Sequence, residues 1–248
     1  MKNSSVLRFL FVLCGSLVLG TPVKAEFTSL HDAAAHGTEY ADVTRFLEAG
    51  ADVNGIQAYS VTPLHLAAKN PHPEITEALI ASGADPNART NDQAVPLLWA
   101  AAQNSNPLIV QMLVDAGADV NVANNFDNTP LHALLLNPYA SQLAPVLLRA
   151  GADVNARNFA GWTPLHQATQ LNFDLAAILV DAGTDVNAKD DMGRTPIFFA
   201  VGVSNADAVA MLIEAGAELN LVDSEGRHLL SYAKNSEISD LLKDNSAR

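Results

Sequence analysis

The tetrapeptide Thr62-Pro63-Leu64-His65 decides how this chain folds, because it recurs along almost the whole sequence. Identical copies begin at Thr129 and Thr163, and looser copies occupy residues 28–31, 95–98, 195–198 and 228–231. The copies start at residues 28, 62, 95, 129, 163, 195 and 228, so consecutive starts are 34, 33, 34, 34, 32 and 33 residues apart. The chain therefore contains about seven repeated units.

A second marker has the same period. It is a glycine followed two residues later by an acidic residue, at Gly50, Gly83, Gly117, Gly151, Gly183 and Gly216. Apolar residues stand three and four positions before each of these glycines, which indicates the buried edge of a helix. A glycine just past such a stretch is typical of the left-handed residue that ends a helix.

The chemistry of the tetrapeptide predicts that it begins a helix. Threonine is a favoured N-cap, and proline fits the first helical position because its missing N–H would be unpaired there. Each unit is thus predicted as helix, turn, helix and hairpin. In the fourth unit, residues 137–140 lengthen the loop between the helices. Pro145 should make the second helix start late or bend.

These markers resemble the ankyrin-repeat family, whose motif reads TPLH at a period near 33. The resemblance spans Phe27 to about Lys243. It implies an all-α repeat solenoid, in which stacked helix-turn-helix units carry projecting β-hairpin or turn tips. The first and last units depart from the pattern, and we expect them to act as caps with polar outer faces.

Residues 1–25 differ from the rest and are predicted to be a cleavable signal peptide, with residues 26–248 as the repeat domain. Lys2 and Arg8 form a basic start, and residues 9–19 form an apolar run that is too short to span a bilayer. The sequence Val23-Lys24-Ala25 then fits a signal peptidase, with cleavage before Glu26. An uncleaved membrane anchor is the alternative. A lipoprotein is rejected, because the residue before Cys14 is Leu13 and lipoprotein sites resemble one another in having a small residue at that position.

Composition limits what the mature chain can do. Cys14 is the only cysteine and lies in the predicted signal, so no disulfide or cysteine-ligated metal is expected after cleavage. Removing the three basic residues of the signal leaves 11 basic and 27 acidic residues, a net charge of −16. Such a chain repels nucleic acid, whose binding depends on neutralising phosphates.

No catalytic, metal or cofactor site is predicted. His31, His65, His132 and His166 occupy equivalent positions in their units, which stack about 8–10 Å apart, whereas ligands of one zinc ion lie about 2 Å from it. We expect each histidine to be satisfied by backbone groups near its own helix start. The recurring aspartates are interpreted as turn residues. No nucleophile elbow, phosphate loop or metal motif is found in the sequence.

The resemblance implies that partners contact the hairpin tips and the adjoining first helices. The residues four, three and one positions before each tetrapeptide are interpreted as having no role in the packing of the fold. They supply the candidate partner-binding residues Tyr59, Phe126, Phe159, Trp162, Met192 and Arg194. Trp162 is predicted to lie at the centre of this surface, so that its loss should weaken partner capture without lowering the melting temperature. Folding of these rings onto neighbouring tips is the alternative, and Trp99 and Phe199 are predicted to fill the core.

The sequence therefore predicts a monomeric scaffold that binds a protein partner in the periplasm of a bacterium, without membrane insertion after cleavage. One alternative is a secreted effector directed at a host. Another is an enzyme with an unfamiliar site. Nothing in the sequence identifies the partner.

Overall fold

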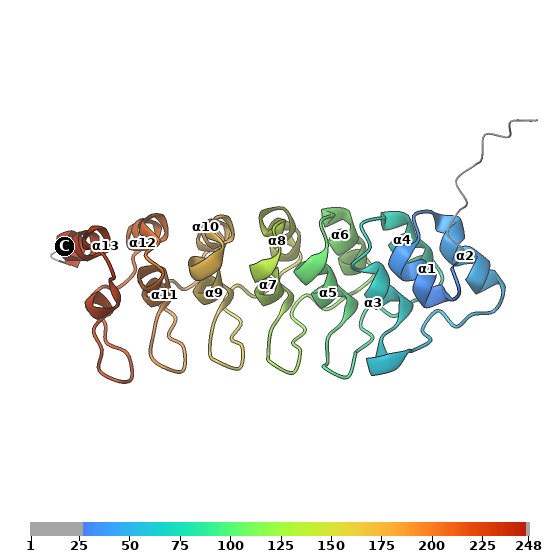
Figure 1. The fold of residues 1–248 in the computed structure, drawn as a ribbon, viewed down its shortest axis with the longest axis horizontal. Coiled ribbons are helices and arrows are strands. Elements are labelled where there is room, and N and C mark those ends of the chain that lie inside the picture. Colours follow the sequence, from blue (N-terminus) through green and yellow to red (C-terminus); the bar gives the residue numbers. More distant parts are fainter. Residues whose placement is uncertain (1–26, 247–248) are drawn as a thin grey trace, which may run out of the picture.

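The computed structural model describes residues 27–246, which form a row of helix pairs (Figure 1). The predicted signal peptide lies outside the described residues. The helices are α1 (Leu30–His36), α2 (Tyr40–Glu48), α3 (Pro63–Ala67), α4 (Pro73–Ala81), α5 (Pro96–Gln103), α6 (Pro107–Asp115), α7 (Pro130–Ala133), α8 (Ala140–Arg149), α9 (Pro164–Leu171), α10 (Phe173–Asp181), α11 (Pro196–Gly202), α12 (Ala206–Glu214) and α13 (Ser236–Ser246). Short 3₁₀ turns occupy η1 (Ala58–Ser60), η2 (Leu134–Leu136) and η3 (Leu229–Tyr232).

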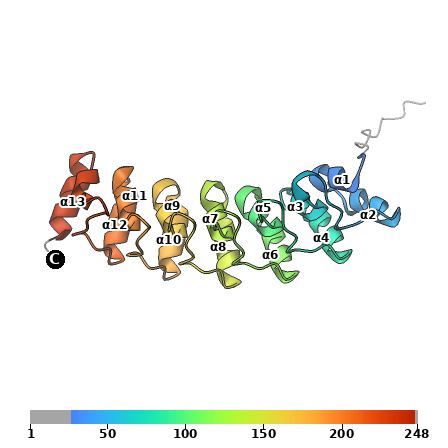
Figure 2. The ribbon, with the colours of Figure 1, turned by 90° about the horizontal axis from the view of Figure 1, so that it is seen from below.

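Each unit packs against its neighbours in a continuous stack. The first helices contact one another in the order α1, α3, α5, α7, α9, α11, and the second helices in the order α2, α4, α6, α8, α10, α12, α13. Figure 2 shows both rows from below, with the long axis of the molecule running across the units. The predicted all-α repeat solenoid is confirmed.

The two sequence markers have the structural roles predicted for them. Helices α3, α5, α7, α9 and α11 all begin at the proline of their tetrapeptide, so that the preceding residue is the N-cap. The six marker glycines have φ between +81° and +90°, in the left-handed region that only glycine adopts without strain. Each therefore ends the second helix of its unit.

Three details differ from the sequence predictions. The N-cap of α1 is Ser29 rather than Thr28, because the Ser29 side chain accepts the Asp32 amide. In the last unit the first helix is reduced to the 3₁₀ turn η3. Helix α8 already begins at Ala140 and includes Pro145, so the expected late start was wrong. The first hydrogen bonds of this helix run from the amides of Gln142 and Leu143 to the Tyr139 carbonyl, and they do not involve Pro145.

Among residues 27–246, none of the helices is both long and apolar enough to cross a bilayer.

Candidate partner surface

The tips between successive units form a row along one edge of the molecule, and hydrogen bonds join them (Figure 1). Each tip is closed by a backbone bond over four residues, such as Asn158 N–H to the Trp162 carbonyl at 2.9 Å. Neighbouring tips are also joined, for example by Phe159 N–H donating to the Phe126 carbonyl at 3.0 Å. In the described residues two of these tips contain an isolated bridge, Gln57 with Val61 and Val222 with His228, and none contains a strand. They are turns held in register with one another.

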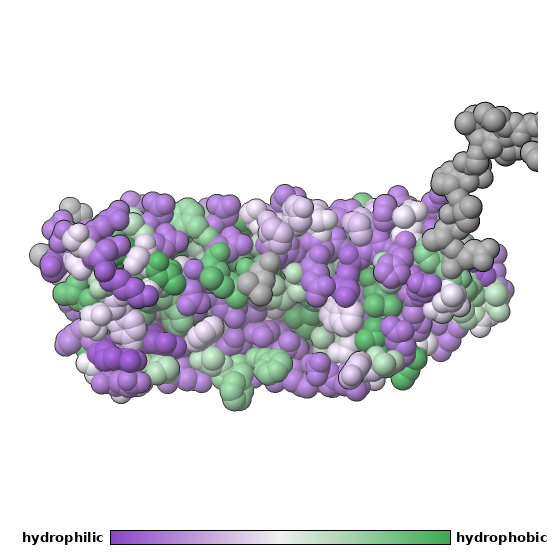
Figure 3. Space-filling model, viewed as in Figure 1, coloured by the Kyte–Doolittle hydropathy of each residue, from purple (hydrophilic) through white to green (hydrophobic). Residues whose placement is uncertain are grey.

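Three of the predicted partner-binding residues are exposed on these tips. The exposed fractions are 76% for Tyr59, 64% for Phe126 and 78% for Phe159. Phe126 and Phe159 lie on adjacent tips, which share the backbone bond above, and an apolar bulge is visible over the tips before α7 and α9 (Figure 3). We call the pair Phe126 and Phe159 the tip patch. Tyr59 lies two tips away.

Trp162 differs from its prediction, because its indole is partly buried rather than free at the centre of an exposed surface. Its ring stands edge-on to the buried Phe199 at a centroid distance of 5.1 Å. Its Nε1–H donates to Oδ2 of Asp190 on the next tip at 3.2 Å. The position before the tetrapeptide therefore packs against the next unit, and the expectation that it lacks a structural duty was wrong.

Met192 and Arg194 are also half-buried instead of being displayed. Two guanidinium nitrogens of Arg194 donate to Oδ2 of Asp190, at 2.9 and 2.7 Å. The guanidinium carbon lies 4.7 Å from the centre of the Phe199 ring. Arg194 thus holds its own tip to the face of α11.

Asp190 is a key residue of this region that sequence reasoning missed. Its side chain is buried and accepts the amides of Met192 and Arg194 on Oδ1, besides the Trp162 and Arg194 bonds on Oδ2. Asp223 repeats this arrangement one unit later with Arg227 and Tyr232. Burial would raise the pKa of Asp223, but these hydrogen bonds hold it well below its ordinary value. The signal was an aspartate four residues before an arginine, present in both tips.

The acidic groups beside the tip patch are available to a partner. Asp92 and Asp127 are exposed, and neither side chain makes a hydrogen bond or ion pair within residues 27–246. The nearby cations are engaged, since Arg157 pairs with Asp191 at 3.1 Å and Arg89 contacts Gln93 and the Ala123 carbonyl. The tip patch is thus apolar with unpaired negative charge at its side.

The recurring histidines link the units. In His65 the Nδ1 atom accepts from the Thr62 hydroxyl and amide, at 2.8 and 3.2 Å, as expected for a group satisfied near its own helix start. Its Nε2 faces the Ala94 carbonyl of the next tip at 3.1 Å and so carries the proton. His132 and His166 repeat the arrangement, and His31 makes the second of these contacts. The bond to the next unit was not predicted.

Burial favours the neutral form of His65, His132 and His166. It lowers the pKa of His65 and His132, and it lowers the pKa of His166 to about 4. Hydrogen bonds to the next tip oppose this shift without cancelling it. Within the described part of the chain, no three histidine, cysteine or acidic residues are grouped so that they could hold a metal ion.

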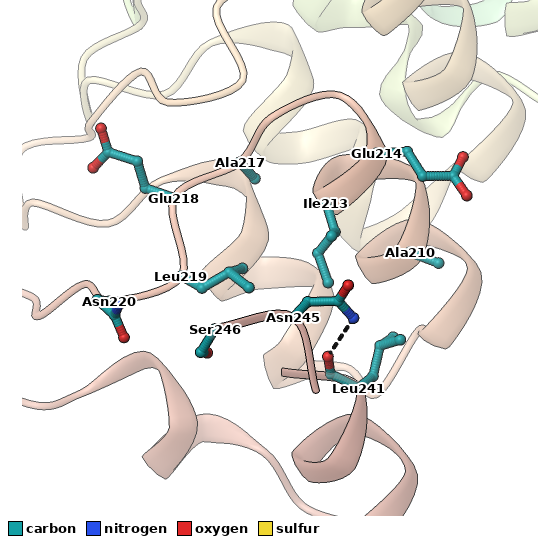
Figure 4. A pocket seen from close by; sticks show the side chains of 10 residues that line it. All are labelled: Ala210, Ile213, Glu214, Ala217, Glu218, Leu219, Asn220, Leu241, Asn245 and Ser246. Atoms are coloured by element: carbon teal, nitrogen blue, oxygen red, sulfur yellow. Dashed lines mark hydrogen bonds between the residues drawn. The ribbon is translucent and has the colours of Figure 1, made fainter. Parts of the chain in front are cut away.

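An open groove of about 690 Å³ lies between α12 and α13. Figure 4 shows its lining, in which Glu214 and Glu218 point away from each other and the Asn245 amide donates to the Leu241 carbonyl at 2.8 Å. Among the residues drawn, these two carboxylates are the only titratable groups. Their arrangement does not provide a paired acid and base.

Comparison with known proteins gives matches along most of the chain. The family model for ankyrin repeats in three copies matches residues 2–90 and 97–190, and the model for a single ankyrin repeat matches residues 192–224. Among solved structures, the human ASB11 ankyrin repeat domain is similar at 25% identity and a TM-score of 0.78, over 87% of this chain and 96% of that one. The ankyrin repeat domain of Bcl-3, described as a unique member of the IkappaB protein family, is similar at 26% identity and a TM-score of 0.76, over 87% and 98%.

Proposed function

Because this chain belongs to the ankyrin repeat family, whose repeats serve protein–protein interaction, we propose that it is an exported scaffold that binds a protein partner through the tip patch. The observation that carries this proposal is the exposure of Phe126 and Phe159 on adjacent tips. Large apolar rings are enriched at interface hot spots, and a monomer gains nothing by leaving two of them in water. Unpaired Asp92 and Asp127 beside them favour a partner segment that carries basic residues.

The double variant Phe126→Ala/Phe159→Ala should weaken partner capture by about thirtyfold or more, which corresponds to about 2 kcal/mol. The melting temperature should hardly change, because both rings are exposed. A photo-crosslinking residue at the exposed position Ala160 would capture the partner in the producing cell. The yield of the crosslinked protein, compared between the variant and the unchanged chain, measures the effect.

Leu108→Ala is the matched control, since Leu108 is an exposed apolar residue at the start of α6 and away from the tips. It should leave capture unchanged. Equal capture by the double variant and the unchanged chain would refute the tip patch as the partner surface.

Export is proposed from residues 1–25, and we place the mature protein in the bacterial periplasm. The exported protein should begin at Glu26 when its N-terminus is sequenced. Cell fractionation separates the two destinations, because retention in the periplasm supports the scaffold and accumulation in the medium or a host supports the secreted effector. Recovery of Met1 at the N-terminus would contradict cleavage.

A further inference from the structure

A row of buried asparagines holds the loops between the two helices of the early units. Asn104 donates from Nδ2 to the carbonyls of Ala68 and Asn70, at 2.7 and 3.0 Å. Its Oδ1 accepts the Asn106 amide at 2.7 Å. Asn70 and Asn137 make the same three kinds of bond, and all three asparagines are 3% exposed or less. At these positions the fold uses a buried polar side chain.

The buried row stops after the fourth unit. In the next two units Asn172 and Asn205 instead cap α10 and α12, by accepting the amides of Leu175 and Ala208. Leu171 and Val203, beside these caps, are 60% and 44% exposed. Phe173 begins α10 and is 39% exposed, and Tyr139, the N-cap residue of α8 in the fourth unit, is 42% exposed. Figure 3 views this face and shows apolar surface gathered at the units of α9 and α11.

The charged residues that accompany these four residues on their own loops are acidic, whereas the exposed Lys234 lies on the equivalent loop of the last unit. Asp174 and Asp207 lie in the first turns of α10 and α12, are exposed, and form no ion pair within the described residues. The loop segments 136–140, 170–174 and 202–207 contain no lysine or arginine. Carboxylates in a first helical turn favour their own helix, but they also attract a cation from outside.

We propose that Tyr139, Leu171, Phe173 and Val203, with Asp174 and Asp207, form a second docking surface, which we call the loop patch. Its occupant is an amphipathic helix of another protein, rich in lysine or arginine and lying along the axis of the solenoid. Neighbouring units are separated by about 8–10 Å, and residues seven apart on a helix by about 10 Å, from the 1.5 Å rise per residue. Apolar side chains at positions i and i+7 therefore reach Leu171 and Val203.

The spacing between units also sets where basic residues of the bound helix would lie. Asp174 and Asp207 are also one unit apart, so basic residues seven apart on the flank of the bound helix would face both carboxylates. This is recognition of a helix by an apolar surface with a charged rim. The loop patch lies on a different edge from the tip patch, and the two surfaces can be tested separately.

The test uses a fluorescent synthetic helical peptide with leucines at heptad spacing and lysines flanking them, titrated into the purified chain and followed by anisotropy. The variant Leu171→Asn/Val203→Asn should weaken binding at least tenfold with an unchanged melting temperature. Asp174→Asn/Asp207→Asn should weaken binding at low salt and reduce its dependence on salt. A peptide with leucines spaced by five residues, or with glutamate in place of lysine, should bind at least tenfold more weakly.

Phe126→Ala/Phe159→Ala is the matched control and should leave the affinity for the peptide unchanged, so failure of the loop patch is distinguishable from failure of the tip patch. Unchanged affinity in the Leu171 and Val203 variant would overturn the proposal. Equal binding of the glutamate peptide would also overturn it. If the peptide did not bind, and the chain instead self-associated in a way that the variant Leu171→Asn/Val203→Asn abolished, the surface would be assigned to a second copy of the chain.

Discussion

Acidification from pH 7 to pH 4 is expected to destabilise the solenoid by about 3 kcal/mol through His166 alone, and by more when His65 and His132 are included. The folded state lowers the pKa of His166 from 6.5 to about 4 by burial. One unit of pKa difference corresponds to about 1.4 kcal/mol. Urea unfolding at pH 7, 6, 5 and 4 measures the loss directly.

The sign follows from proton binding. Above pH 6.5 the rings are neutral in both states, and the full stability is present. As the pH falls below 6.5, the unfolded chain binds protons that the folded chain does not, so the free energy of unfolding decreases until the pH reaches the folded pKa. The loss therefore lies between about pH 6.5 and pH 4, and Asp223, whose pKa is lowered, contributes only at lower pH.

His166→Leu is the matched variant, because Leu98 stands at the equivalent position in the third unit. It should be less stable at pH 7, since it lacks the bond to the Arg194 carbonyl, but its stability should fall less steeply on acidification. An equally steep fall in this variant would show that other groups cause the acid response.

Replacing Trp162 with alanine should lower the free energy of unfolding by about 3 kcal/mol, by loss of a large packed ring and of a bond to a buried carboxylate. The ring contacts Phe199, and Nε1–H donates to Asp190. Urea unfolding at pH 7 checks this value. This expected loss of stability is the opposite of the unchanged melting temperature that the sequence alone predicted.

Trp162→Phe separates the two contributions. It keeps an aromatic ring against Phe199 but cannot donate to Asp190, so it should cost only about 1 kcal/mol. If Trp162→Ala proved as stable as the unchanged chain, the indole contacts in the structure would contribute nothing to folding.

The sequence predicted the fold well because the fold is set by local signals repeated along the chain. Each proline and each marker glycine acts on its own helix end, so their positions alone locate the helices. Phe199 was correctly assigned to the core, with 7% exposed, and Trp99 packs against the core while remaining partly exposed. Local rules were weaker at the two ends, where Ser29 rather than Thr28 caps α1.

The candidate surface was less predictable, because exposure at a tip depends on the neighbouring unit. Phe126 and Phe159 stand three and four residues before their tetrapeptides and are exposed, whereas Trp162 stands one residue before its own and packs on Phe199. That contact joins residues 37 positions apart, beyond the reach of local pattern. An aspartate preceding an arginine by four residues would have shown that Arg194 is already engaged.

The histidine links have a consequence for how such a scaffold can diversify. His65, His132 and His166 each bind a main-chain carbonyl, which belongs to Ala94, Trp162 and Arg194 respectively. An acceptor supplied by the main chain is present whatever side chain the residue carries. The histidine bond between units therefore does not depend on the side chain of the residue that accepts it, so substitutions at exposed positions such as Phe126 and Phe159 can accumulate without breaking this bond. A repertoire of new specificities is open to the chain through changes of surface residues alone.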